Sequence, residues 1–317
     1  MLDISNLDFT DKLIKEIESA DLFYRNVDLS TLGRNIEEDL INNRTCLFST
    51  IIVSDTFDFF NDLKRVSINR TIKEDKSNSR LLSITDLKYP PAKVRDKLYY
   101  NRASYKKQSI FYGGFGKLQA LFENLPDTGD LFTMSTWRQK SNTKLHYAEI
   151  FHDEKIHRHT DLYKSEWSQY CGMLKTLDDK RRNALQKLLS LTTYFFIRPV
   201  DTSSKIEYIF SAFLANKIFE MHFTDKIEAI LYPSVQMEYI STNLAIQPNS
   251  FDEKFEFLKA EEFIVLHRTE GKRQIISQKL AEATKTDNDI LCWENEYIEN
   301  DIKDFMRNNN VNLDHLK

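Results

Sequence analysis

The chain has 317 residues, of which 41% are hydrophobic and 12% aromatic; this is enough to bury a sizeable core and excludes an intrinsically disordered protein. Its 44 basic and 48 acidic residues give a formal net charge of −4, which argues against a general nucleic-acid-binding surface. The three cysteines are odd in number and far apart in sequence, which fits neither a disulfide framework nor a zinc site.

Two further absences in the sequence bear on where the protein acts. The N-terminal residues lack the basic start and apolar run of a signal peptide. No apolar stretch is long enough to span a bilayer. We therefore expect a cytoplasmic protein that acts without a membrane or a nucleic acid.

In chain order, the first 64 residues favour helices. Leu13, Ile14, Ile17 and Leu22 fall near one helical face, and residues 31–44 and 55–65 continue the helical spacing. From Arg65 the pattern changes to short runs of β-branched and aromatic residues, which predict strands over 65–72, 80–84, 97–104 and 109–115.

Later segments alternate between the two patterns. Helices are predicted over 117–125, 160–197 and 205–220, and strands over 130–139, 144–151 and 227–236. Residues 254–270 and 273–285 predict an antiparallel hairpin that turns near Gly271. Because helices and strands mix without a regular βαβ rhythm, the expected fold class is α+β rather than doubly wound.

The glycines are concentrated in one place. Of the 7 glycines in the chain, Gly113, Gly114 and Gly116 lie between a predicted strand and a predicted helix. A phosphate-binding P-loop is excluded, because Leu118 follows Lys117 where Ser or Thr is required. The dinucleotide-binding fingerprint also fails, because the position of its third glycine is Gln119.

A histidine-rich segment is a weaker candidate for a site. His152, His157 and His159 do not share one helical face with a general-base glutamate, and no cysteine lies near them. A solvated polar segment is the expected interpretation.

The residues around the glycines suit a phosphorylated nucleoside. Arg102 can hold a phosphate through paired donors, and Tyr112 can stack on a flat ring. Glu123, two turns into the predicted helix, can stabilise positive charge on a sugar carbon during glycosidic cleavage. Each residue also has an ordinary alternative: a surface ion pair for Arg102, a core position for Tyr112 and an exposed helical position for Glu123.

Residues 101–123, NRASYKKQSIFYGGFGKLQALFE, resemble the central motif of the RES-domain family, bacterial toxins named for an Arg, a Glu and a Ser. Residues 208–219, 227–236 and 243–248 resemble, in the same order, the family's later helix, its Tyr-Pro-Ser strand and an Asn-containing segment. The resemblance covers residues 65–250. Departures from the family pattern are Asn101 and Ala229 in place of Gly, and Ser104 in place of Asn.

The resemblance implies specific roles for residues of this chain. It puts catalysis on Glu123, Arg102 and Ser234, with Glu123 stabilising the transition state and Ser234 contacting the nicotinamide side or positioning the glutamate. It puts NAD binding on four further residues, Arg70, Tyr112, Gly113 and Asn243. Arg65 is the alternative to Arg70 as the arginine that holds the pyrophosphate together with Arg102.

For the whole protein, the resemblance implies a split β-sheet core similar to that of ADP-ribosyltransferases. It also implies cleavage of the nicotinamide–ribose bond of NAD by hydrolysis or phosphorolysis. NAD is then a substrate, and no cofactor or metal is needed. Two alternatives stay open: ADP-ribosylation of a protein target, and a non-catalytic interaction module.

The resemblance also suggests an organisation of the chain. We expect an N-terminal helical extension over 1–64, a catalytic domain over 65–250 with a helical insertion at 160–197, and a C-terminal extension over 251–317. Family toxins are usually paired with an antitoxin, which here would be a separate protein. The added helices are candidates for that docking surface, for a homo-oligomer interface or for a lid.

Overall fold

The computed structural model describes residues 52–57, 60–69, 80–150, 161–200, 208–220, 226–269, 274–294 and 307–308. It is a mixed α+β structure that divides into two compact units, each assembled from segments far apart in sequence. Among the described residues, the first unit takes its parts from 52–55, 99–108 and 146–235, and the second from 56–98, 109–145 and 236–308.

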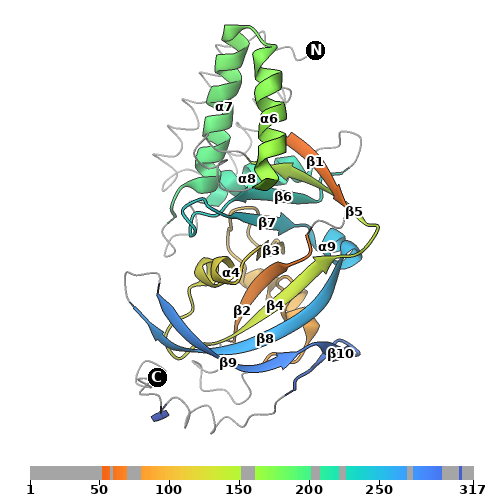
Figure 1. Cartoon of the computed structure of the whole chain (residues 1–317), viewed down its shortest axis with the longest axis vertical. Helices are drawn as coiled ribbons and strands as arrows, with labels where there is room; N and C mark the ends of the chain where they lie inside the picture. The colour runs from red at the N-terminus through yellow and green to blue at the C-terminus, as the bar shows by residue number, and fades with distance from the viewer. Residues whose placement is uncertain are drawn as a thin grey trace. The chain divides into compact units, whose positions relative to one another are not determined.

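The second unit is built on antiparallel strands. Among its described residues, six strands are hydrogen-bonded in the order β7-β3-β2-β4-β8-β9 (Figure 1). Their bounds are β2 (Leu63–Asn69), β3 (Phe111–Gly114), β4 (Leu131–Gln139), β7 (Thr242–Ile246), β8 (Phe255–Arg268) and β9 (Ile275–Ala283).

Register determines which side chains of this sheet share a face. Gly114 on β3 lies opposite Lys64 on β2 and opposite Asn243 on β7. Residues opposite one another on neighbouring strands point to the same face, and successive residues alternate. Gly114, Lys64, Asn243 and Tyr112 therefore belong to one face, and Phe111, Gly113 and Arg65 to the other.

Helix α4 (Lys117–Asn124) packs on the first of these faces, against β2 and β3 (Figure 1). It begins after Gly116, whose backbone is extended, and ends at Leu125, which adopts the left-handed conformation with φ 41°. Its residues Ala120 and Leu121 are buried against apolar side chains of the sheet, namely Val66, Phe132, Met134 and Val265. This packing presents the last turn of α4, with Glu123, at the edge of the core.

The opposite face of the sheet carries an aromatic core. Phe111 stacks on Phe251 with ring centroids 3.9 Å apart, and Trp137 packs edge-on to Phe251 at 4.9 Å. Phe251 belongs to α9 (Pro248–Lys254), so these contacts fix that short helix on β3 and β4. The buried Trp137 satisfies its indole by donating from Nε1 to Ser135 Oγ at 2.8 Å.

The first unit contains a parallel pair of strands and three described helices. β5 (Lys144–Glu149) and β6 (Ala229–Pro233) pair in parallel, with Tyr147 opposite Ala229. The helices are α6 (Asp161–Lys175), α7 (Asp179–Ile197) and α8 (Ile209–Phe219). Asp178 caps α7, because its carboxylate accepts from the Arg181 amide at 2.9 Å. β1 (Ile52–Phe57) precedes the sheet strands in sequence.

Most predicted elements are confirmed: the strands that became β2 to β6, the helices α4, α6, α7 and α8, and the antiparallel pairing of β8 with β9. A short second ribbon, β10 (Lys285–Asp287) with β11 (Ile290–Cys292), follows β9. The turn near Gly271 lies outside the described residues, as do Arg70, the three histidines of 152–159 and residues 1–51. No helix in the described ranges is both long and apolar enough to cross a membrane.

Three local predictions were wrong. Residues 55–65, expected to be helical, contribute to β1 and to the start of β2, because pairing of β2 with β4 overrides the helical spacing. Residues 80–84 lead into a 3-10 helix, η1 (Ile84–Asp86), which Ser83 caps by accepting from the Thr85 amide. Residues 97–104 are not a strand: Asn101 and Ser104 exchange backbone hydrogen bonds and close a tight turn around Arg102.

Candidate functional site

Two of the three clustered glycines, Gly113 and Gly114 at the end of β3, lie in close packing. A Cβ atom at Gly113 would lie 2.8 Å from Leu63 Cδ1, and one at Gly114 would lie 2.5 Å from Gln119 Cδ. Real carbon contacts are about 3.5–4.0 Å, so neither position accepts a larger residue without displacement. Gly116 has no such neighbour, since the nearest atom would lie 4.0 Å away. The first two glycines therefore let β3 approach β2 and α4 closely.

Glu123 is held by a residue from a different element. Asn243 on β7 donates from Nδ2 to Glu123 Oε1 at 2.7 Å. Asn243 is 6% exposed, whereas Glu123 lies in the last turn of α4 and is exposed. The contact between the predicted residues Glu123 and Asn243 thus joins a buried amide to a carboxylate that solvent can reach.

Gln119 completes this group, although no sequence motif had pointed to it. Its Nε2 donates to Asn243 Oδ1 at 2.7 Å and to the Thr242 carbonyl at 2.5 Å, and its Oε1 accepts from the Phe115 amide at 3.0 Å. Gln119 is 2% exposed. The available signal was a polar residue one helical turn before Glu123, on the side of α4 that faces the glycines.

Tyr112 and Gly113 lie beside this group on β3. Tyr112 pairs with Ala245 and Gly113 with Leu244, two residues and one residue along β7 from Asn243. Tyr112 is half-buried and shares the α4 face with Gly114 and Asn243, because residues two apart on a strand point the same way. The structure therefore places Tyr112 on the same sheet face as Asn243, the hydrogen-bond partner of Glu123, whereas Gly113 faces the opposite core.

Arg65, the alternative to Arg70, points to the other face of the sheet. Its guanidinium lies 5.7 Å from the Phe111 ring centroid, and Nη1 donates to the Tyr112 carbonyl at 3.2 Å. Its Nε is buried and has no hydrogen-bond partner among the described residues. Burial lowers the pKa of Arg65 to about 10. These contacts make Arg65 a packed residue of the aromatic core, on the face away from Glu123.

Arg102 and Ser234 belong to the first unit. The Arg102 Nη1 donates to the carbonyl oxygens of Phe196 (2.5 Å) and Arg198 (3.3 Å), at the C-terminus of α7. The guanidinium also lies 5.0 Å from the Tyr208 ring centroid. A cation at a helix C-terminus meets the negative end of the helix dipole. Ser234 follows β6 directly and is fully buried.

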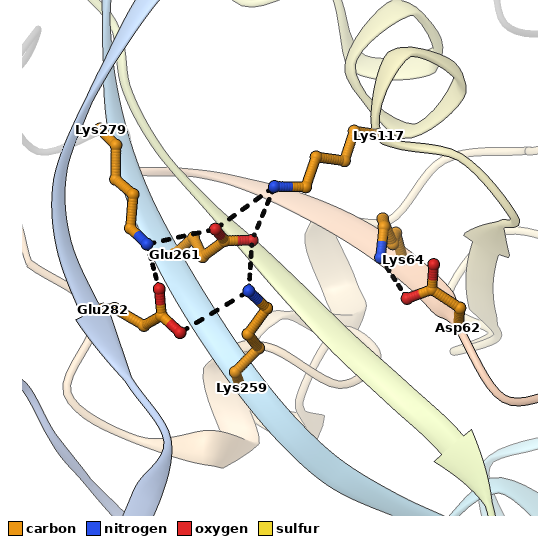
Figure 2. Close-up of polar contacts among 7 residues, drawn as sticks. All are labelled: Asp62, Lys64, Lys117, Lys259, Glu261, Lys279 and Glu282. Atoms are coloured by element: carbon orange, nitrogen blue, oxygen red, sulfur yellow. Dashed lines mark hydrogen bonds and ion pairs between the residues drawn. The ribbon is translucent and has the colours of Figure 1, made fainter.

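A second polar cluster lies at the start of α4 (Figure 2). The buried Glu261 of β8 meets three lysines: Lys117 at 3.2 Å, and Lys259 and Lys279 at 3.3 Å each. Glu282 of β9 pairs with two of them, Lys259 at 3.6 Å and Lys279 at closer range. The cluster ties the first residue of α4 to β8 and β9.

The charges in this cluster act on one another. Burial alone would raise the pKa of Glu261, but the hydrogen bond from Lys117 and the charges of Lys259 and Lys117 outweigh it, and the pKa lies below its usual value. The hydrogen bond from Lys279 lowers the pKa of Glu282, and the same bond raises the pKa of Lys279. Glu261 is therefore an anion at neutral pH despite its burial.

Within the described ranges, no group of three His, Cys, Asp or Glu side chains could hold a metal ion. Comparisons of the chain with protein-family models, with curated proteins and with solved structures find no match.

Proposed function

We propose that this protein cleaves the nicotinamide–ribose bond of NAD and so depletes cellular NAD and arrests growth. The observation that supports this most is the carboxylate of Glu123, which is exposed to solvent and held by the buried Asn243. A positioned carboxylate can stabilise the positive charge that develops on the sugar during glycosidic cleavage, and the half-buried Tyr112 is on the same sheet face as Asn243. The proposed fold of the catalytic core is the split sheet of ADP-ribosyltransferases.

In the proposed reaction, the bond from ribose C1′ to the nicotinamide nitrogen breaks, and nicotinamide leaves with the electron pair. An oxygen of water or phosphate then bonds to C1′ and gives ADP-ribose or its 1-phosphate; the proton lost from water passes to solvent. Glu123 stabilises the positive charge that develops on the ribose. Tyr112 supplies a ring against which the nicotinamide or ribose packs.

The pyrophosphate contact is assigned to Arg70. Arg70 stays the candidate from the family resemblance. Arg65 is no longer proposed as its alternative, because Arg65 packs over Phe111 on the face away from Glu123. Arg102 already donates to backbone carbonyls at the end of α7. We therefore assign Arg102 the task of holding the turn of residues 101–104, and leave contact with the pyrophosphate to Arg70.

Nicotinamide release from NAD by the purified protein tests the proposal, with phosphate present and absent. We expect Glu123→Gln to slow release by about 10²- to 10³-fold, the range found when a group that stabilises transition-state charge is removed. Glu253→Gln is the matched control, because Glu253 is an exposed glutamate on the short helix α9. Release by wild type and by Glu253→Gln, with loss in Glu123→Gln, supports the proposal.

NAD labelled in its adenosine part distinguishes the alternative activities. Label in free ADP-ribose indicates hydrolysis, label in the 1-phosphate indicates phosphorolysis, and label on protein indicates ADP-ribosyl transfer. The proposal is refuted if folded wild-type protein releases no nicotinamide in any of these conditions.

A further inference from the structure

A run of hydrogen bonds leads from the backbone of Phe115 to the Glu123 carboxylate. The Phe115 amide donates to Gln119 Oε1 at 3.0 Å, and Gln119 Nε2 donates to Asn243 Oδ1 at 2.7 Å. Asn243 Nδ2 then donates to Glu123 Oε1 at 2.7 Å. Every bond in the run points the same way, from the β3–α4 turn toward Glu123.

The direction of the run is set by backbone groups that have only one hydrogen-bonding role. A backbone N–H can only donate, so Phe115 requires the oxygen of Gln119. A carbonyl can only accept, so Thr242, 2.5 Å from Nε2, requires the nitrogen of Gln119. Only one orientation of the Gln119 amide satisfies both neighbours, and that orientation turns an N–H toward Asn243.

The orientation of Asn243 follows from that of Gln119. Because Gln119 offers an N–H, Asn243 meets it with the carbonyl oxygen and turns its own NH₂ toward Glu123. Gln119 is 2% exposed and Asn243 is 6% exposed, so water does not supply alternative partners freely. If the Asn243 amide were reversed, its NH₂ would face the NH₂ of Gln119. Two buried donors without acceptors cost more free energy than one hydrogen bond contributes.

We propose that Gln119 is a positioning residue, which makes Asn243 present an N–H rather than a carbonyl oxygen to Glu123. A hydrogen bond from an amide N–H stabilises an ionised carboxylate and holds its direction, whereas a facing carbonyl oxygen repels it. The kinetic consequence of this inference rests on the proposed function of Glu123, but the orientation of Asn243 does not.

Two substitutions of Gln119 separate orientation from mere packing. Gln119→Glu keeps the acceptor for Phe115; when ionised, it offers no N–H to Asn243 or to the Thr242 carbonyl, so the Asn243 amide should reverse. Gln119→Met removes all the polar atoms and leaves Asn243 free to keep its N–H on Glu123. We expect nicotinamide release to fall roughly 10- to 100-fold in Gln119→Glu, the loss that corresponds to one hydrogen bond to a charged group, and by much less in Gln119→Met.

The pH profile gives a second readout that packing alone would not produce. At low pH the carboxyl introduced by Gln119→Glu is protonated and can again donate to Asn243, so its rate relative to wild type should recover on acidification. Gln119→Met should show no such recovery. Gln108→Glu is the matched control, because Gln108 makes the same kind of bond, Nε2 to Asn216 Oδ1 at 2.8 Å, within the first unit.

The side-chain amide signals of Asn243 in a ¹⁵N–¹H spectrum test the orientation without any activity. Assigned with Asn243→Asp, they should shift in Gln119→Glu at neutral pH and move back at low pH. Unshifted signals overturn the inference, and so do equal, pH-independent rate losses in the two Gln119 variants. If wild-type protein releases no nicotinamide, the proposed function fails, and the spectrum alone decides the role of Gln119.

Discussion

Replacing Gly114 by alanine should displace the Gln119 amide, because the new Cβ would lie 2.5 Å from Gln119 Cδ. The amide is held by hydrogen bonds to Phe115, Thr242 and Asn243. Losing three bonds at about 1 kcal/mol each lowers the free energy of unfolding by about 3 kcal/mol. Gln119→Ala loses the same three bonds and should cost a similar amount.

The double variant Gly114→Ala/Gln119→Ala tests directly whether alanine at position 114 acts only through the Gln119 amide. With no amide left to displace, alanine at position 114 fits, and the total loss should stay near about 3 kcal/mol rather than about 6 kcal/mol. Urea unfolding followed by circular dichroism measures all three variants. Gly116→Ala is the control, with its nearest atom 4.0 Å away, and should cost below about 1 kcal/mol. Additive losses in the double variant would refute the packing argument.

Two further outcomes are expected. Glu261 has a lowered pKa in the folded protein, so its charge stabilises the fold above the unfolded-state pKa of about 4.3, and this contribution is lost as the pH falls through the folded pKa. In urea unfolding, the free energy of unfolding should fall less between neutral and acid pH in Glu261→Gln than in wild type. An identical pH dependence in the two proteins would contradict the role of the lysine cluster. Arg102→Met should lower the free energy of unfolding by about 2 kcal/mol, and Arg102→Lys should restore only part, because an ammonium lacks the planar fork of guanidinium. Unchanged unfolding with lost nicotinamide release would instead assign Arg102 to the substrate.

The sequence alone determined the local elements that carry the candidate site. Hydrophobic spacing was sufficient for α4 and for β3, because a helix and a strand each have a fixed period that their apolar residues follow. The clustering of the glycines marked the β3–α4 turn, because glycine is a residue type that favours tight turns. Glu123 was therefore located on its helix without a structure.

Tertiary pairing decided what local patterns could not. Residues 55–65 carry helical spacing, yet part of this segment is a strand, since the backbone groups of β2 find partners on β4. Likewise, Arg65 and Lys64 are neighbours in sequence, and only the register with β3 and β4 shows which of them faces α4. The alternating pattern of a strand is the same whichever of its two sets of side chains faces the helix. Only the strand pairing therefore shows which face each side chain is on.

The contacts of Gln119 show the same division. From the sequence, Gln119 is one polar residue on a short helix, and its partners Thr242 and Asn243 are more than a hundred residues away. Only the packing of β7 beside β3 brings those partners to it, and only the absence of a side chain at Gly114 leaves room for its amide. The sequence thus determined which residue types were available near Glu123, whereas the fold decided which of them touch, because hydrogen bonds between distant segments depend on register and space.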